Sequence, residues 1–203
     1  MVSATDIETR PAVSRLARAV TEVFAPAVLA AVMPLIIAVD AASSWAAGLG
    51  WGLLAVLFSS AIPYGIIHLG VRRGTLTDHH IGVREQRRKP LIYGLLSVLA
   101  GLTALIVLDA PRPLTAMVLV MFAVLLTVTL ISQVWKLSAH AAVSAGAASV
   151  LIAVFGPALA ATFVVVALIG CSRVRLGDHT AGQVIAGAVA GTLIATPTFV
   201  LLA

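Results

Sequence analysis

The stretch that decides the fold runs from Ala141 to Cys171 and reads AAVSAGAASVLIAVFGPALAATFVVVALIGC. It contains no charged residue, and Phe155-Gly156-Pro157 near its middle is typical of a turn. Polar residues flank it on both sides. We therefore expect the stretch to leave one membrane face as a helix of about 16 residues and to return as a second helix, each roughly 25 Å long.

The rest of the chain repeats this pattern of long apolar segments. Of its 203 residues, 61% are hydrophobic and 10% are charged, a composition that a soluble domain of this length could not bury. The segments are long enough to cross a hydrocarbon core of roughly 30 Å as helices. The sequence thus predicts an all-α, polytopic membrane protein. Further spans are expected at 23–42, 47–69, 91–109, 113–135 and 180–202.

We expect one transmembrane domain, residues 23–203, preceded by a polar segment, 1–22, that forms a cytoplasmic tail or a short interfacial helix. Seven crossings would put the two termini on opposite faces, whereas one long tilted helix over 141–171 would give six. The Gly-Pro pair favours seven. In the last span, Gly187-x-x-x-Gly191 predicts close contact with another helix.

The cations and imidazoles of the chain gather on one predicted face. All five histidines lie in or beside its loops, and so do twelve of the thirteen Lys and Arg residues, the exception being Arg112. The positive-inside rule makes this face cytoplasmic, in a bacterial plasma membrane. Because these residues lie in short loops between spans, they indicate membrane lipids and an anionic substrate as partners, rather than nucleic acid.

Side chains for phosphoryl transfer occur among these loops. Such a site needs cations for the phosphate oxygens, a nucleophile and an acid for the leaving group. Arg173 can fork two phosphate oxygens, His179 can attack phosphorus as a neutral imidazole, and His140 can protonate the departing oxygen.

Acidic residues on this face are few. Asp78, Glu85 and Asp178 come from separate positions, which gives little support to a magnesium cage. Asp178 also lies where an N-cap of the last helix is expected. We therefore predict a site that needs no metal.

Three motifs in this order resemble those of the type 2 phosphatidic acid phosphatase superfamily of membrane lipid phosphatases. The family pattern is Lys-x6-Arg-Pro, Pro-Ser-Gly-His and Ser-Arg-x5-His-x3-Asp. The third motif appears as Ser172-Arg173-x5-His179, the second as Leu137-Ser138-Ala139-His140, and the first, loosely, as His80-x6-Arg87-Arg88. The resemblance covers residues 70–190 in outline.

The resemblance implies a phosphatase-like helical core and a role for each matched residue. His179 would form a phosphohistidine and His140 would be the acid, without a metal. The remaining matched residues would bind substrate phosphate: Arg173, Arg87 with its neighbours Arg84 and Arg88, Ser138, and His80 in the position of the family's Lys. Apart from Arg87, the run from Arg84 to Lys89 equally fits an anchor at the lipid surface, and His79 beside His80 fits a solvated side chain.

Gln183 is the main departure from the family pattern, because it occupies the position of the acidic residue that orients the nucleophilic histidine. A glutamine can accept a hydrogen bond but cannot stabilise an imidazolium by charge, and loss of the acid from a catalytic triad costs several powers of ten in rate. In the second motif, Leu137 and Ala139 replace Pro and Gly, so backbone contacts with phosphate differ too.

Three functions remain open from sequence. The first is a metal-independent phosphatase for a lipid phosphate or diphosphate, most simply an isoprenoid one delivered on the cytoplasmic side. The second is a prenyl-diphosphate cyclase or transferase on the same fold, which would release pyrophosphate and use Mg²⁺. The third is a non-enzymatic lipid-phosphate binding protein or transporter. Retention of both His140 and His179 favours an enzyme over a binding protein.

Overall fold

A computed structural model describes the backbone of residues 4–203 and the side chains from Ser14 onward. Within this range the chain is helical and contains no strand, which confirms the predicted all-α class. A π-helical turn, Leu57–Ala61, joins α3 to α4, and 3-10 turns cover Arg84–Gln86 and Pro157–Ala161. The α-helices are α1 Ala4–Val23, α2 Pro26–Ala41, α3 Trp45–Val56, α4 Ile62–Arg72, α5 Arg88–Val107, α6 Arg112–Ile131, α7 Ala139–Phe155, α8 Thr162–Arg175 and α9 Ala181–Leu202.

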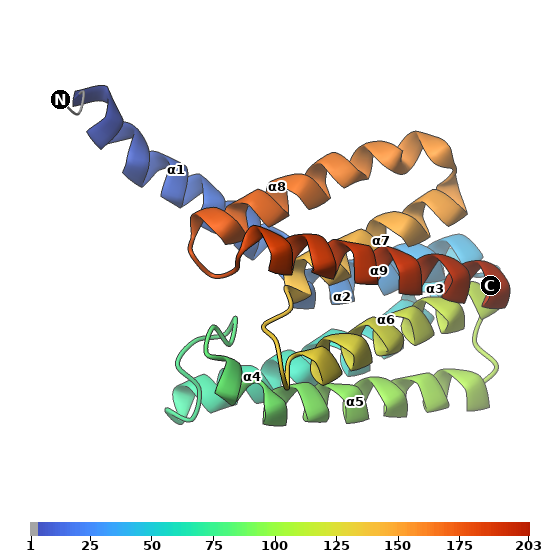
Figure 1. The fold of residues 1–203 in the computed structure, drawn as a ribbon. Helices are drawn as coiled ribbons and strands as arrows, with labels where there is room; N and C mark the ends of the chain where they lie inside the picture. The colour runs from blue at the N-terminus through green and yellow to red at the C-terminus, as the bar shows by residue number, and fades with distance from the viewer. Residues whose placement is uncertain (1–3) are drawn as a thin grey trace.

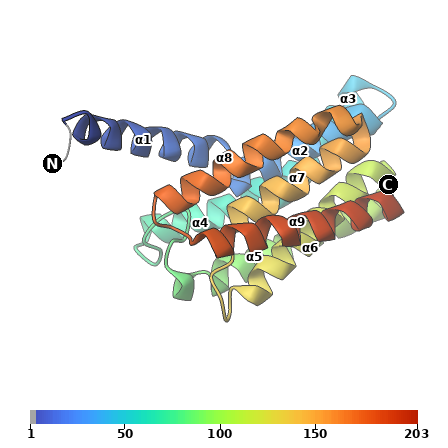
Figure 2. The same cartoon turned by 45° about the horizontal axis from the view of Figure 1, so that its top comes forward.

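The helices from α2 onward run up and down along one bundle, while α1 projects away from it (Figure 1). Because α3 and α4 form one continuous pass, the described chain runs along the bundle seven times, and its N- and C-terminal ends lie at opposite ends of the molecule (Figures 1 and 2). The turn predicted at Gly156 is present, with a φ of +95° that favours glycine.

The helices are compatible with an integral membrane protein. Five passes in the described residues are long and apolar enough to cross a membrane, and Ser14–Val23 with Pro26–Ala41 would make a sixth despite a 42° bend. The helix α7 is apolar but only 17 residues long. Many of the outward-facing side chains are large and apolar, such as Leu53, Leu96 and Leu193, as expected for a surface in contact with lipid tails.

Several observed boundaries differ by a few residues from the predicted ones. The helix that corresponds to the span predicted at 23–42 begins later, at Pro26, because α1 ends at Val23 and Pro26 starts a separate helix. The span predicted at 113–135 ends early, at Ile131. The predicted tail or interfacial segment, 1–22, lies in α1 over most of its length, and residues 1–3 fall outside the described range.

The close helix contact predicted at Gly187 and Gly191 is confirmed, and the partner is α7. A Cβ at Gly187 would lie 2.6 Å from the Ser138 carbonyl oxygen, and one at Gly191 would overlap the backbone of Ala142. Glycine therefore lets the two helices approach nearly to backbone contact. This packing fixes the start of α7 against the start of α9.

Three loops gather at the end of the bundle opposite the C-terminus: residues 73–87, 132–138 and 176–180 (Figures 1 and 2). They carry or adjoin all three sequence motifs. The fold thus brings together segments that lie up to a hundred residues apart in the chain.

Candidate functional site

A cavity of about 210 Å³ extends from these loops into the bundle. Its inner wall is apolar and comes mainly from α2, α5, α6 and α7, with residues such as Met33, Val98 and Val124. Its polar lining at the loop end consists of basic and imidazole side chains: His79, His80, Arg87, His140, Arg173 and His179. The cavity therefore suits an amphiphile with an anionic head and an apolar tail.

Arg173 projects from the last turns of α8 rather than from a loop, so the predicted loop over 172–179 was wrong. Its side chain is 2% exposed, its Nη1 lies 3.1 Å from an Asp178 carboxylate oxygen, and its Nε has no partner. Asp178 is consequently an ion-pair partner, not the predicted N-cap, which is Thr180. The hydroxyl of Ser172 donates to the Leu168 carbonyl, 2.8 Å away.

His179 lies just before α9, and its Nδ1 is 3.2 Å from Oε1 of Gln183. The same amide oxygen accepts the backbone N–H of Thr180 at 3.1 Å, and the Thr180 hydroxyl accepts the N–H of Gln183 in return, which completes a capping box. Because this oxygen accepts both bonds, Nδ1 of His179 must carry the proton. Nε2 is then left with the lone pair.

The charge state of His179 suits a nucleophile. Burial, together with the neighbouring guanidiniums of Arg87 and Arg173, lowers the pKa of His179 to about 4, against the opposing effect of the bond to Gln183. Burial and nearby positive charge both disfavour imidazolium. The ring is therefore neutral at physiological pH.

His140 and Ser138 belong to the start of α7 but face different surroundings. The His140 ring is 4% exposed, lines the cavity, and has no hydrogen-bond partner for its Nε2. Ser138 is fully buried and is the N-cap of α7, where its hydroxyl accepts the N–H of Ala141 at 3.4 Å. It is not part of the cavity lining, so the predicted phosphate contact of Ser138 is not supported by this position.

Arg87 is the cavity-lining member of its basic run. Its side chain is 6% exposed, and it donates to the carbonyls of Ile81 at 2.9 Å and Leu137 at 3.3 Å. Among the residues that the structure describes, no carboxylate pairs with it. Since a buried charge without a counter-ion is costly, this guanidinium favours an anionic ligand.

Arg84 and Arg88 do not line the cavity. Arg88 is exposed, and Arg84 lies beside Glu85, at 3.4 Å, and the Gln133 carbonyl. Neither position supports the predicted phosphate contact. Of the basic run, the structure brings only Arg87 to the other motif residues.

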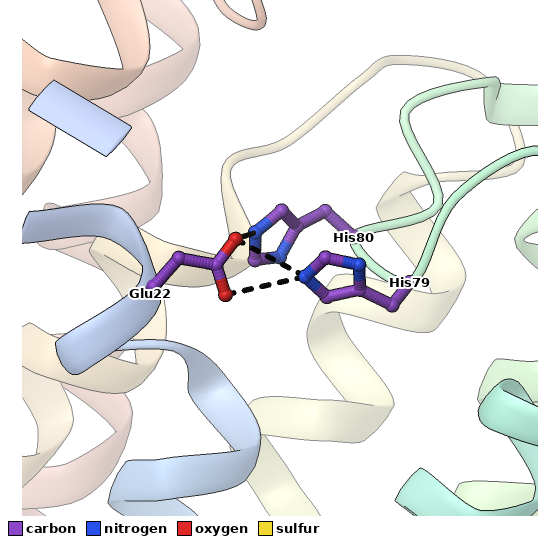
Figure 3. A group of neighbouring side chains, drawn as sticks. All are labelled: Glu22, His79 and His80. Atoms are coloured by element: carbon purple, nitrogen blue, oxygen red, sulfur yellow. Dashed lines mark hydrogen bonds and ion pairs between the residues drawn. The ribbon is translucent and has the colours of Figure 1, made fainter. Parts of the chain in front are cut away.

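The loop over 73–87 adds His80, whose ring centre lies 5.2 Å from that of His140. Burial lowers the pKa of His80, so this side chain is mostly neutral where the family pattern has a charged Lys. Sequence reasoning missed its partner, Glu22, which lies 3.0 Å from its Nε2. Figure 3 shows the Glu22 carboxylate facing both His79 and His80. Glu22 lies near the end of α1, and no motif links it to the loop.

The assembled site holds two buried guanidiniums, a neutral imidazole with an available lone pair, and a second imidazole with an unpartnered nitrogen. It opens into an apolar cavity. Comparison of the chain with protein-family models, characterised proteins and solved structures finds no match.

Proposed function

We propose that this protein is a membrane enzyme that hydrolyses a lipid phosphate or diphosphate, most simply an isoprenoid one, through a phosphohistidine on His179. The observation that carries the proposal is the buried Arg87, which has no carboxylate partner among the described residues and lies in the same cavity as Arg173, His140 and His179. This group provides two phosphate-binding cations, a nucleophile and an acid at one end of an apolar chamber.

The shape of the cavity supports a substrate with a greasy tail. The inner wall is formed mostly by aliphatic and small side chains, with Ser59, Ser60 and Tyr64 as further polar members, whereas the basic and imidazole groups lie at the loop end. A phosphate held by Arg87 and Arg173 would therefore leave its hydrocarbon chain among α2, α5 and α6. Burial of each methylene contributes about 0.8 kcal/mol to such binding.

The reaction would proceed in two balanced steps. Nε2 of His179 attacks phosphorus, the bond from phosphorus to the leaving oxygen breaks, and His140, which must enter this step as the imidazolium, gives that oxygen the proton on its Nε2. Water then attacks the phosphohistidine, gives a proton back to His140, and releases inorganic phosphate and neutral His179. Arg87 and Arg173 stabilise the charge on the phosphoryl oxygens in both steps.

Gln183 affects the expected rate of this reaction but does not prevent it. Its amide oxygen holds the Nδ1 proton of His179, as an acidic residue would, but it does not add a negative charge. We therefore expect a slow phosphatase. The cationic loops favour an active face on the cytoplasmic side of a bacterial plasma membrane.

The test is product analysis with detergent-purified protein and geranylgeranyl diphosphate or its monophosphate, run once in EDTA and once with Mg²⁺. We expect inorganic phosphate from the unaltered chain and a loss of about 10⁴-fold in His179→Ala. His68→Ala, which alters an exposed histidine outside the cavity, is the matched control and should retain full activity. Pyrophosphate with a rearranged or transferred hydrocarbon, formed only with Mg²⁺, would overturn the proposal in favour of prenyl chemistry.

A further inference from the structure

The carboxylate of Glu22 and the imidazoles of His79 and His80 meet at one point on the loop end of the bundle (Figure 3). Nε2 of His80 lies 3.0 Å from Oε1 of Glu22, and Nε2 of His79 lies 3.2 Å from each carboxylate oxygen. One donor atom from each residue lies within 4.8 Å of the other two. Among the described residues, this is the one such group of three.

This spacing is close to that of a metal site. In four-coordinate zinc with bonds of about 2.0–2.1 Å, neighbouring ligand atoms are about 3.3 Å apart. The carboxylate-to-imidazole distances already have this size. The three donor atoms lie within 4.8 Å of one another and are therefore close enough to share one ion.

The loop backbone supports the two histidines before any ion binds. An Asp78 oxygen accepts the N–H of Gly82 at 3.0 Å, and Asp78 also accepts the backbone N–H of His80. Gln86 accepts both the N–H and the hydroxyl of Thr77. These bonds tie the loop to itself on either side of the histidine pair and limit the entropy lost on coordination.

We infer that Glu22, His79 and His80 form a zinc site that binds one Zn²⁺ and ties the end of α1 to the loop between α4 and α5. Two imidazoles and a carboxylate are a ligand set that zinc accepts with a fourth position left for water, whereas Mg²⁺ prefers oxygen ligands in octahedral geometry. Coordination requires that Nε2 of each imidazole carries no proton, and any proton there moves to Nδ1 or to the buffer, so no other reactant is needed.

The site is open to ions from solution. The side chains of Glu22 and His79 are 54% and 41% exposed, and that of His80 is 18% exposed. His79 and His80 also line the polar end of the cavity. The ion would lie at the rim of the cavity, outside the His140–His179 reaction, and the inference does not rest on the proposed function.

The experiment uses the full chain, purified in detergent without a histidine tag, stripped with EDTA and exchanged into metal-free buffer. Zn²⁺ is titrated against a chromophoric chelator. We expect one ion per chain with a micromolar or tighter Kd. Each ligand variant should weaken Zn²⁺ binding by at least about 100-fold: Glu22→Gln, His79→Ala and His80→Ala. Loss of an outer-shell partner already weakens metal binding by up to about this factor, and these residues would contact the ion directly. His68→Ala should bind as the unaltered chain does.

Thermal unfolding separates loss of the ion from loss of the fold. The four variants should melt in EDTA within a few degrees of the unaltered chain, and Zn²⁺ should raise Tm only where all three ligands are present. Absence of saturable binding below the millimolar range would overturn the inference, as would retention of binding in both His79→Ala and His80→Ala. Phosphate release in EDTA would be unaffected by either result, so the two proposals fail separately.

Discussion

The two sides of the cavity's polar end are built in different ways. On one side, α7, α8 and α9 present His140, Arg173 and His179 from helix ends. On the other, a long loop between α4 and α5 presents His79, His80 and Arg87. The helical side is positioned by capping and close packing, and the loop side by hydrogen bonds to distant parts of the chain.

Backbone contacts position the helical side. The N–H of Ser138 donates to the Gln183 carbonyl at 3.3 Å, which joins the start of α7 to the first turn of α9. The loop side relies instead on Arg87, which bonds Ile81 in its own loop and Leu137 in the next. One buried side chain thus positions the loop and also faces the cavity. Structural and functional roles therefore coincide in one side chain on each side: Arg87 on the loop side, and on the helical side Gln183, which completes the capping box and holds His179.

The largest effect that tests this contrast is expected at Arg87. Arg87→Ala removes a buried cation and two bonds to backbone carbonyls, so phosphate release should fall by about 10³-fold, the upper range for one donor to a developing charge, and Tm should fall with it. Arg88→Ala and Arg84→Ala, in the same basic run but outside the cavity lining, should change the rate by less than about threefold. Phosphate release and Tm measured on the three variants check this, and equal losses would contradict the special position of Arg87.

A smaller, opposite effect is expected at Gln183. Gln183→Glu keeps the acceptor for the N–H of Thr180 and the Nδ1 proton of His179, and it adds the missing charge. Phosphate release should rise by about 10- to 100-fold, because a carboxylate stabilises the imidazolium-like phosphohistidine. The same change at the exposed Gln133 is the control and should leave the rate unaltered.

The pH profile refines the Gln183 comparison. In the unaltered chain, His179 has a pKa of about 4, so kcat/KM should be maintained down to that pH and fall about tenfold per unit below it, as the nucleophile becomes protonated. Gln183→Glu should move this acid limb upward, because a nearby carboxylate favours the charged ring. An acid limb near the ordinary histidine value in the unaltered chain would mean that His179 is not buried beside two arginines.

The smallest effect concerns the packing that supports the helical side. Gly191→Ala places a methyl group on the backbone of Ala142, and this overpacking should lower the free energy of unfolding by about 1 to 2 kcal/mol. Gly50→Ala in α3 has open space around it and should raise stability by up to about 1 kcal/mol through helix propensity. Thermal unfolding in detergent compares the pair, and equal behaviour would show that α7 and α9 are not in close contact.

The contrast between the two sides also explains what could be predicted from sequence. The turn at Gly156 and the close contact at Gly187 and Gly191 follow from local residue types, and both were correct. The ends of α7, α8 and α9 adjoin the same cavity. They bring three side chains to it: His140, Arg173 and His179. The side chain of Ser138 was assigned to phosphate by motif, although its preference for an N-cap position could have indicated the bond that it makes.

The loop side could not be predicted in the same detail. Glu22 meets His79 across 57 residues of sequence, and no periodicity or spacing signals a contact of that range. Asp178 was wrongly assigned as an N-cap. An aspartate just before a helix can either cap that helix or pair with a nearby arginine, and the sequence does not distinguish the two roles. The contact of Glu22 is set by tertiary packing, whereas Asp178 lies on the helical side and pairs with Arg173, a near neighbour in the sequence.

The most direct test of the central claim is to trap the phosphohistidine. The purified protein is mixed briefly with ³²P-labelled isoprenoid phosphate in EDTA, quenched in alkali, and digested. We predict label that is stable in alkali and labile in acid, on the peptide that contains His179, and none in His179→Ala. Phosphate release without such a label, or an undiminished label in His179→Ala, would contradict the account.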